Sequence, residues 1–444
     1  MNHKLLLWSV TVACAGFLFG FDTAVISGAD QPIQQLWQTS ALHHGLFIMS
    51  SALWGTVLGA LLANFPCDRF GRKPTLIGIG ILYLLSALGS ALATDPVFFS
   101  LMRFIGGIGV GISSIAVPAY IAEIAPAQQR GRLVALYQFQ IVFGILIAFL
   151  SNYLLAEIFF LDWRWMLGIE VIPAALYLLL VSVVPESPRW LLLHKNDHQA
   201  ALGVLSHSGE ANPGQVITDI RNEQAKRSSE ALFNRVYTVP VVLAFLLAMF
   251  NQLSGINFVI YFAPRIFNLA GMDSSSALLS SAGIGVVNLL FTLLGMLLID
   301  KIGRKTLLLA GSVGYVISLT AITLAFALNL SGLFVVVFIF MFIAAHAVGQ
   351  GAVIWVYISE IFPNSVRTKG QSLGSSTHWV FAALITLLMP LVLSTFSPVT
   401  IFAFFAIMMG LQGVCVLKLF PETRGKSLEA LGLSLTGKSA GLGE

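Results

Sequence analysis

An acidic and a basic residue stand inside long apolar segments of this sequence, where an ionised side chain is costly. Asp22 lies in the segment that begins near residue 7, and Arg103 lies in the one that begins near residue 97. A charge at the centre of a membrane helix costs about 2.5–3.5 kcal/mol on insertion scales. If the two segments pack together, the charges attract each other, and removing one leaves the other buried and unpaired.

Proton binding is the chemistry that such a pair can perform. Protonation of Asp22 would neutralise it and free Arg103, which would change the favoured conformation and link proton binding to that change. The alternative interpretation is a structural ion pair that takes up no proton. Ionisable residues inside a membrane are functional by default, which favours the first interpretation.

Amide side chains recur in another apolar segment, which begins near residue 239. Gln252 and Asn257 flank Gly255, a residue that allows a helix to unwind locally. An amide offers both donors and an acceptor, which suits the vicinal hydroxyl groups of a sugar. Taken singly, each amide has an alternative role in an interhelical hydrogen bond, worth about 0.6 kcal/mol on average.

The elements that position these residues are membrane-spanning helices. Only 10% of the 444 residues are charged, 57% are apolar, and the mean hydropathy is +0.87. Soluble proteins have about 25% charged residues. Apolar stretches of the length that spans a bilayer number twelve and begin near positions 7, 45, 75, 97, 134, 164, 239, 277, 306, 332, 371 and 397.

The first stretch is interpreted as a span and not as a secretory signal peptide. Asp22 lies in its second half, and no cleavage site of small residues follows at a fitting place. The three cysteines, Cys14, Cys67 and Cys415, are far apart and show neither a disulfide framework nor metal-binding spacing. We therefore expect no metal and no cofactor.

The basic residues are concentrated in alternate loops and at the two ends of the chain. All but three of the 24 Lys and Arg residues fall at the amino terminus, in the alternate loops after spans 2, 4, 6, 8 and 10, or at the carboxyl end; the exceptions are Arg103, Arg164 and Arg265. This pattern predicts that both termini are cytoplasmic. The isoelectric point near 9.0 is thus a signal of topology, and no nucleic-acid partner is expected.

Three pairs of matched motifs indicate that the chain is a duplication. The pairs are Asp68–Lys73 with Asp300–Lys305, Glu123–Arg130 with Glu360–Arg367, and Pro185–Arg189 with Pro421–Gly425. We expect an amino-terminal six-helix bundle (1–190), a cytoplasmic linker with short helices (191–236), a carboxyl-terminal six-helix bundle (237–432) and a disordered tail (433–444). Parallel halves with the substrate between them are an established design for transporters.

Taken together, these motifs resemble the sugar porter family of the major facilitator superfamily. The resemblance covers nearly the whole chain and includes PESPRW at 185–190, QLSGIN at 252–257 and PETRGK at 421–426. It implies an all-α membrane protein with twelve transmembrane helices in two pseudo-symmetric six-helix bundles. It also implies a sugar site at mid-membrane, and an Asp–Arg pair that proton symporters of the family hold at the positions of Asp22 and Arg103.

The resemblance also implies a set of sugar-contacting residues. These are Gln138, Asn251, Gln252, Asn257, Tyr261, Asn288, Trp355, His378 and Trp379. Trp355 and Trp379 are suited to stack on the apolar C–H face of a sugar. For Trp355 the alternative is interfacial anchoring, because it lies only five residues before Glu360.

This chain departs from the family pattern at several positions. Asn251 stands where Gln is common, His378 stands where symporters have Gln or Asn, and Phe262 replaces a common Tyr. In span 10, where the family usually has prolines, Gly349 and Gly351 are expected to supply the bend.

Two further ionisable residues lie in apolar segments. His346 is interpreted as a packed core histidine and not as a ligand. Glu170, near the outer end of span 6, is given no role.

The charged residues of the matched motifs are predicted to form a cytoplasmic gate. They are Asp68, Arg69, Arg72, Glu123, Arg130, Glu186 and Arg189 in the first half, and Asp300, Arg304, Glu360, Arg367, Glu422 and Arg424 in the second. Exposed ion pairs are worth only about 0–1 kcal/mol each. A network that exists in one conformation can still favour that conformation. The alternative, a role in topology alone, requires the basic residues but not the acids.

The sequence therefore predicts a monosaccharide transporter of the cell membrane that works by alternating access. Its partners are a hexose or pentose, a proton and the lipid bilayer, and we expect it to import sugar with Asp22 as proton site and to act as a monomer. A facilitative uniporter with a structural Asp22–Arg103 pair is the alternative.

Two other classes of protein are less favoured. A non-transporting sugar sensor typically carries a long cytoplasmic tail, and only about 20 residues follow Arg424. An enzyme is not expected, because the sequence offers no nucleophile–base pair, metal cluster or phosphate loop. The glycine-rich run at 106–111 lies inside a span with no strand before it, and it predicts helix packing.

Overall fold

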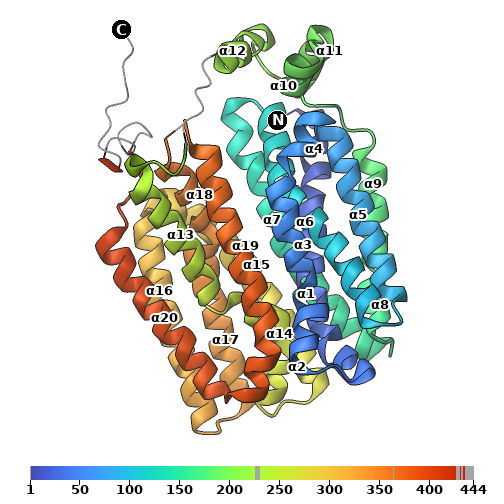
Figure 1. Cartoon of the computed structure of the whole chain (residues 1–444), viewed down its shortest axis with the longest axis vertical. Coiled ribbons are helices and arrows are strands. Elements are labelled where there is room, and N and C mark those ends of the chain that lie inside the picture. Colours follow the sequence, from blue (N-terminus) through green and yellow to red (C-terminus); the bar gives the residue numbers. More distant parts are fainter. Residues whose placement is uncertain (1, 226–230, 364, 427–430, 432–433, 436–444) are drawn as a thin grey trace. The chain divides into compact units, whose positions relative to one another are not determined.

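The structure is a computed structural model that describes residues 2–225, 231–363, 365–426, 431 and 434–435. Of these described residues, none is in a β-strand. Most of the expected tail, 433–444, and residues 226–230 of the expected linker lie outside the described part. Figure 1 shows long helices that run side by side within each half of the chain.

The number of spans agrees with the sequence. Within the described chain, eleven helices are long and apolar enough to cross a membrane, and there are twelve if the bent pair Ala41–Met49 and Ser51–Leu62 counts as one span. The two parts of that pair meet at an angle of 43°. The predicted fold class, an all-α membrane protein with twelve spans, is confirmed.

The chain divides into two compact units. Unit 1 comprises Met1–Gln38 with Ser50–Arg227, and unit 2 comprises Thr39–Met49 with Ser228–Glu444. The helices of unit 1 are α1 (His3–Trp37), α3 (Ser51–Leu62), α4 (Asn64–Arg69), α5 (Arg72–Leu92), α6 (Pro96–Ile124), α7 (Ala127–Tyr153), η2 (Leu154–Ile158), α8 (Trp163–Gly168), α9 (Val171–Val181), α10 (Pro188–Trp190), η3 (Leu191–Lys195), α11 (His198–Ser208) and α12 (Pro213–Ala225).

Unit 2 begins with the first turns of the second span. Its helices are α2 (Ala41–His43), η1 (His44–Met49), η4 (Arg235–Tyr237), α13 (Thr238–Leu253), α14 (Ile256–Leu269), α15 (Ser274–Ile302), α16 (Arg304–Ala327), α17 (Gly332–His346), η5 (Ala347–Gly351), α18 (Ala352–Ile361), α19 (Arg367–Thr395) and α20 (Pro398–Leu419). Helices α2 and η1 pack on α19. A Cβ atom at Gly45 would lie only 1.9 Å from the carbonyl oxygen of Leu387, so glycine permits this approach.

Close backbone contacts in unit 1 pack the helices that carry the charged residues against their neighbours. A Cβ at Gly107 of α6 would lie 1.8 Å from the carbonyl oxygen of Ala52 in α3, and a Cβ at Gly20 of α1 would lie 1.9 Å from that of Ile141 in α7. Small residues allow such approaches between membrane helices. The interpretation of the glycine-rich run at 106–111 as a packing surface agrees with these contacts.

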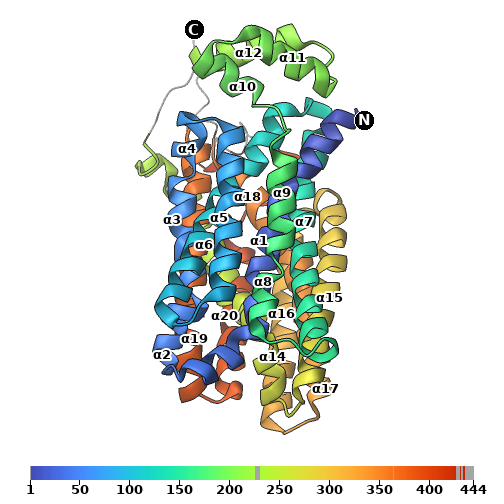
Figure 2. The same cartoon turned by 90° about the vertical axis from the view of Figure 1, so that its right-hand side faces the viewer.

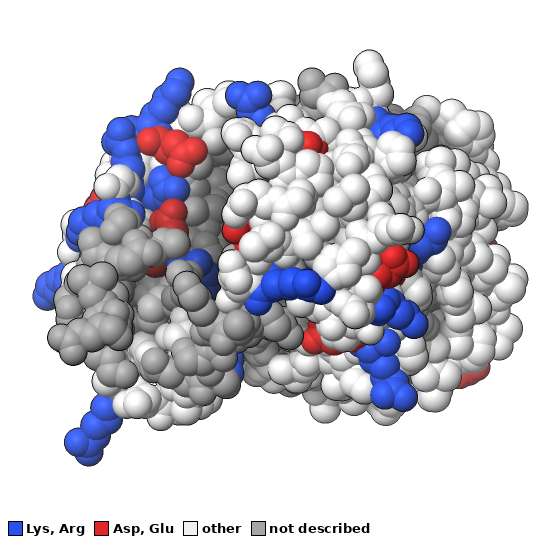
Figure 3. Space-filling view, turned by 90° about the horizontal axis from the view of Figure 1, so that it is seen from above, with Lys and Arg blue, Asp and Glu red and all other residues white. Residues whose placement is uncertain are grey.

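Short helices lie beyond one end of the spans of unit 1. Helices α10, α11 and α12 lie at the end where α4 is found (Figures 1 and 2). Their apolar side chains form a small cluster of Leu192, Ala201, Leu205, Ile217 and Ile220. Viewed from this end, the surface carries Lys and Arg interspersed with Asp and Glu (Figure 3).

Candidate functional site

Asp22 and Arg103 form a buried ion pair. Asp22 lies on α1 and Arg103 on α6, and each residue is only 2% exposed. Nη1 of Arg103 contacts Oδ1 of Asp22, and Nη2 donates to the backbone carbonyl of the same residue at 3.0 Å. The pairing expected from the sequence is present in the structure. It neutralises both charges in a setting where an isolated charge would be costly.

Glu170, to which the sequence assigned no role, is a second buried carboxyl group near this pair. It is 2% exposed, lies between α8 and α9, and interacts electrostatically with both Asp22 and Arg103. Among the described residues, no hydrogen bond reaches its Oε1 or the Nε of Arg103. A buried polar atom without a partner requires an explanation. Unit 1 thus holds two carboxyl groups and one guanidinium group within a single buried region.

Span 7 is broken at the amide cluster, as the glycine predicted. Helix α13 ends at Leu253 and α14 begins at Ile256, and Gly255 between them has φ of +85°. Ser254 forms two hydrogen bonds at this break: its backbone amide donates to the Phe250 carbonyl at 3.0 Å, and its Oγ donates to the Asn251 carbonyl at 2.6 Å. The break places Asn251 and Gln252 at the end of one helix and Asn257 in the first turn of the next.

We expect Gly255→Ala to destabilise unit 2. The new Cβ would lie 2.8–3.0 Å from ring atoms of Phe405, and the left-handed backbone costs a non-glycine residue about 1–2 kcal/mol. Thermal unfolding of the purified protein in detergent measures the loss. Gly410→Ala is the matched control, because nothing lies within 4 Å of a Cβ there. Equal melting temperatures for the two variants would contradict the prediction.

Gln252 joins the amide cluster to His378. Its Nε2 lies 3.0 Å from Oδ1 of Asn251 and 3.2 Å from either ring nitrogen of His378 on α19. The side chain is 1% exposed, and its Oε1 has no partner among the described residues. A buried acceptor of this kind is suited to receive a hydrogen bond from a ligand hydroxyl group.

Aromatic rings surround His378. The ring of Trp355, on α18, lies 5.1 Å from that of His378, and the ring of Trp379 lies 4.8 Å from it in an edge-on arrangement. Trp379 is 7% exposed, whereas Trp355 is 39% exposed. Amide, imidazole and indole groups therefore meet in one part of unit 2.

The remaining candidates lie on α7, α14 and α15. Tyr261 on α14 and Asn288 on α15 are buried, and Asn257 is half-buried. The Oδ1 atom of Asn288 accepts from Thr292 at 3.4 Å. Gln138 is half-buried on α7 of unit 1.

A π-helical turn takes the place of a proline kink in span 10. This turn is η5. Gly349 in the turn packs against Gly311 of α16, and a Cβ at Gly349 would lie 2.9 Å from the Gly311 Cα. Gln350 in the same turn donates to Gln412 at 2.5 Å, and Gln412 donates to Ser312 at 3.1 Å. The two glycines thus lie in the π-helical turn, and a buried amide chain joins this turn to α16 and α20.

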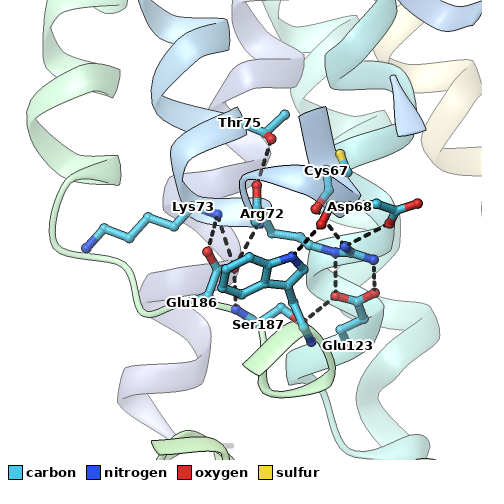
Figure 4. A network of polar contacts seen from close by, with 10 residues as sticks. Cys67, Asp68, Arg72, Lys73, Thr75, Glu123, Glu186 and Ser187 are labelled. Carbon is cyan, nitrogen blue, oxygen red and sulfur yellow. Dashed lines mark hydrogen bonds and ion pairs between the residues drawn. The ribbon is translucent and has the colours of Figure 1, made fainter. Parts of the chain in front are cut away.

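A network of charged residues lies at the end of unit 1 where α4 is found (Figure 4). Arg72 binds both oxygens of Glu123, at 3.0 and 2.9 Å, and also Asp68 at 3.2 Å. Glu186 accepts from the backbone amide of Arg72 at 2.8 Å, and Ser187 Oγ donates to Glu123 at 2.5 Å. A bidentate arginine–carboxylate pair fixes orientation as well as charge.

Unit 2 repeats this network residue by residue. Arg304 binds both oxygens of Glu360, at 3.2 and 2.9 Å, and also Asp300 at 3.1 Å. Glu422 accepts from the backbone amide of Arg304 at 2.9 Å, and Thr423 Oγ1 donates to Glu360 at 2.6 Å. The acids of the matched motifs therefore have structural partners within their own unit.

The other arginines of the predicted gate differ in exposure. Arg69, Arg130 and the side chain of Arg424 are exposed, whereas Arg189 and Arg367 are half-buried. The backbone amide of Arg424 donates to Glu422 at 3.0 Å, and Nε of Arg367 donates to the Phe362 carbonyl at 3.3 Å.

The two matched glutamates have opposite pKa shifts. Burial raises the pKa of Glu186 above its usual value, although backbone amides donate to it. Burial acts in the same sense on Glu422, but backbone donors outweigh it and lower the pKa; they come from Arg424, Arg304, Lys305 and Thr423. The carboxyl group of Glu186 thus contributes to stability below its ordinary pKa of about 4.3, and that of Glu422 contributes above it.

The effects of Glu186→Gln and Glu422→Gln on thermal stability should therefore differ in their pH dependence. Glu422→Gln is expected to destabilise more at pH 7 than at pH 4, because the wild-type contribution is lost as the pH falls through the lowered pKa. Glu186→Gln is expected to destabilise more at pH 4, because the wild-type contribution is lost as the pH rises through the raised pKa. Melting temperatures in detergent across this range measure both effects. Parallel pH profiles for the two variants would refute the assignment.

Comparisons with known proteins agree with these features. A family model described as "Sugar (and other) transporter" matches residues 8–433. The chain is 34% identical to the arabinose-proton symporter of Bacillus subtilis (strain 168), over 96% of this chain and 94% of that protein. It is also 34% identical to the D-xylose-proton symporter of Escherichia coli (strain K12), over 96% and 95%.

A solved structure gives the same result. The inward-open conformation of the xylose transporter XylE from E. coli superposes with a TM-score of 0.85 at 32% identity. The superposition covers 96% of this chain and 99% of that chain.

Proposed function

The chain belongs to the sugar transporter family, and from this premise we propose that it imports a monosaccharide together with a proton. It is a multi-pass membrane protein. Two relatives of nearly the same length are named as pentose–proton symporters, one for arabinose and one for D-xylose. Their names support a pentose or the similar hexoses as candidate substrates of this chain.

The single observation that carries proton coupling is the buried Asp22–Arg103 pair with Glu170 beside it. A carboxylate that is paired inside the membrane has a protonated alternative, in which Arg103 loses its counter-charge. Glu170 then becomes the nearest second partner for the guanidinium group. Proton binding thereby changes the contacts between α1, α6 and the α8–α9 junction, and this change is the physical basis of coupling.

The amide, imidazole and indole groups of unit 2 support sugar binding. Gln252 offers a buried acceptor, and His378 offers a nitrogen that donates or accepts. Trp355 and Trp379 offer flat apolar faces to the C–H groups of a sugar. Gln138, Asn251, Asn257, Tyr261 and Asn288 complete the proposed set of sugar-contacting residues.

Alternating access requires that each unit can hold a defined shape while the conformation changes. We assign this role to the networks around Arg72 and Arg304, which tie loop glutamates to helix ends within one unit. The relative XylE has been solved in an inward-open conformation, which supports such a cycle for this family. The concentration of Lys and Arg in alternate loops supports a cytoplasmic location for both termini.

A facilitative uniporter is the second candidate. The observation that favours it is the bond from Arg103 Nη2 to the backbone carbonyl of Asp22, because this bond persists whether or not the carboxyl group is protonated. In that case the pair would stabilise the packing of α1 on α6.

Sugar-induced proton movement tests the proposed function. The purified protein is reconstituted in weakly buffered liposomes, and the external pH is recorded on addition of xylose, arabinose, glucose, galactose or fructose. Alkalinisation with one or more sugars is the expected result. Sugar exchange without proton movement would establish the uniporter, and the absence of exchange for every sugar would contradict monosaccharide transport.

A further inference from the structure

Phe160, in the connection between spans 5 and 6, has a backbone conformation that is unusual for its residue type. Its φ is +54°, in the left-handed region, where a bulky side chain is a rare outlier. It follows η2, and the Leu161 amide closes the turn by donating to the Leu155 carbonyl at 2.8 Å. Helices commonly end on such a left-handed residue, which is usually glycine and sometimes asparagine. Phenylalanine at this position therefore carries a conformational cost that glycine would avoid.

The end of α16 in unit 2 has the same kind of turn with a residue that suits it better. Asn329 has φ of +50°, and the amide of Leu330 donates to the Ala325 carbonyl at 2.9 Å. The other two non-glycine residues with positive φ in the described chain are a glutamine and an asparagine. Phe160 alone among these four has an apolar side chain. An outlier that persists despite its cost is a reason to look for a function.

The side chain of Phe160 is not buried in the protein. Phe160 is 84% exposed, and three other large apolar residues of the connection are also exposed: Ile158 at 53%, Phe159 at 62% and Trp165 at 58%. Packing within unit 1 therefore does not compensate for the backbone cost. Exposed apolar groups that gather in this way mark sites of contact with protein or membrane. We call residues 158–165 the aromatic loop.

The aromatic loop joins two membrane-spanning helices, so it lies at a membrane surface. The span before it covers Ala127–Ile158, and the span after it covers Trp163–Val181. Figure 2 shows α8 at the end of unit 1 that is remote from α4 and α10. Farther along the second span, Ile172 and Leu176 are 68% and 55% exposed, as expected of side chains that contact lipid. The exposed apolar residues of the loop thus continue a lipid-facing surface along the chain.

Arg164 indicates the depth of the loop relative to the bilayer. Its Cζ lies 4.3 Å from the ring centroid of Trp163, and its Nη2 donates to the Ala93 carbonyl at 3.1 Å. The side chain is 35% exposed, and an exposed charge avoids the hydrocarbon core. The other residues of the loop lie within six positions of Arg164, which places them near the headgroup level. Trp is enriched at this level because its ring is amphipathic.

We propose that the aromatic loop is a membrane anchor, in which Phe159, Phe160 and Trp165 insert into the headgroup region of the phospholipid leaflet remote from α4. Contact with lipid supplies the stabilisation that the protein does not give to Phe160. Asp162 lies 3.9 Å from Arg164 and offsets its charge. The anchor therefore requires the boundary between apolar chains and polar headgroups, and it does not require anionic lipid. The inference is independent of which solute the chain transports.

Fluorescence quenching of the full-length protein in phosphatidylcholine liposomes tests this proposal. The contribution of Trp165 is the difference in emission between wild type and Trp165→Phe. Lipid brominated near the headgroup should quench this contribution more strongly than lipid brominated near the end of the acyl chain, and aqueous iodide should quench it little. Quenching by iodide alone would show that the loop faces water. Protection from all of these quenchers would show that protein covers the loop, and either result would overturn the proposal.

Phe160→Asn gives a second test. Asparagine suits the left-handed turn but removes the ring, so quenching of Trp165 by the shallow brominated lipid should decrease. The contribution of Trp165 is again obtained by difference, against the double variant Phe160→Asn with Trp165→Phe. Asn329→Gly is the matched control, because it changes the corresponding left-handed residue of unit 2 without removing a ring, and its quenching should equal that of wild type. Unchanged quenching in Phe160→Asn, or an equal decrease in both variants, would overturn the anchor.

Discussion

Asp22→Asn is expected to abolish sugar accumulation against a gradient. Asparagine has nearly the shape of a protonated aspartate but cannot exchange a proton, so a proton gradient has no means to act on the transporter. A gradient of one pH unit is worth about 1.4 kcal/mol per proton and supports roughly tenfold accumulation at one proton per sugar. In the variant, the internal sugar concentration should rise only to the external value. Accumulation in liposomes with an imposed pH gradient measures the difference.

The variant also leaves Arg103 without its counter-charge, so transport must be separated from folding. Sugar exchange without a gradient and the melting temperature are therefore measured in parallel. Asp219→Asn is the matched control, because Asp219 is an exposed aspartate on α12, outside the spans. Accumulation by Asp22→Asn that equals the wild-type level would exclude Asp22 as the essential proton site. The next residue to replace would then be Glu170.

Gln252→Ala should have the second-largest effect, on sugar affinity. The wild-type side chain offers a buried Oε1 with no partner among the described residues and holds His378 through Nε2. Removal of a buried hydrogen-bond partner costs about 1–3 kcal/mol, so the Kd for sugar should rise by about five- to 150-fold. Isothermal titration of the purified protein gives this value directly.

A control for Gln252→Ala is available in the same unit. Gln412 is also a buried glutamine, but its two amide atoms already bind Gln350 and Ser312. Gln412→Ala should lower the melting temperature and leave the Kd for sugar close to that of wild type. Equal losses of affinity in both variants would show that the effect comes from looser packing of unit 2 and not from a sugar contact.

Features that depend on local pattern were predictable from the sequence. The spans follow from the apolar stretches. The second span is among them, and the structure adds a bend of 43° between η1 and α3. The break in span 7 follows from Gly255, because glycine takes a positive φ at little cost. The pairing of Asp22 with Arg103 was expected because a charge inside a membrane requires a partner.

Features that depend on packing between distant segments were not predictable. Glu170 is one carboxyl group in an apolar segment, and nothing in its neighbours along the chain indicates that it lies near Asp22 and Arg103. The chain from Gln350 to Gln412 joins residues that are 62 positions apart. Such contacts require the tertiary structure.

The break in span 7 divides one span into two helical rods joined at Ser254 and Gly255, and the second rod departs from helical geometry at Phe262. Helix α13 has 16 residues and α14 has 14, so at 1.5 Å per residue they are about 24 and 21 Å long. Each rod is shorter than the hydrocarbon core of about 30 Å, and the joint lies inside the bilayer. A rotation of about ten degrees at the joint would move the far end of α14 by roughly 4 Å, given that length. Such a rotation would displace Asn251 and Gln252, which lie next to the joint, several times less than the far end of α14.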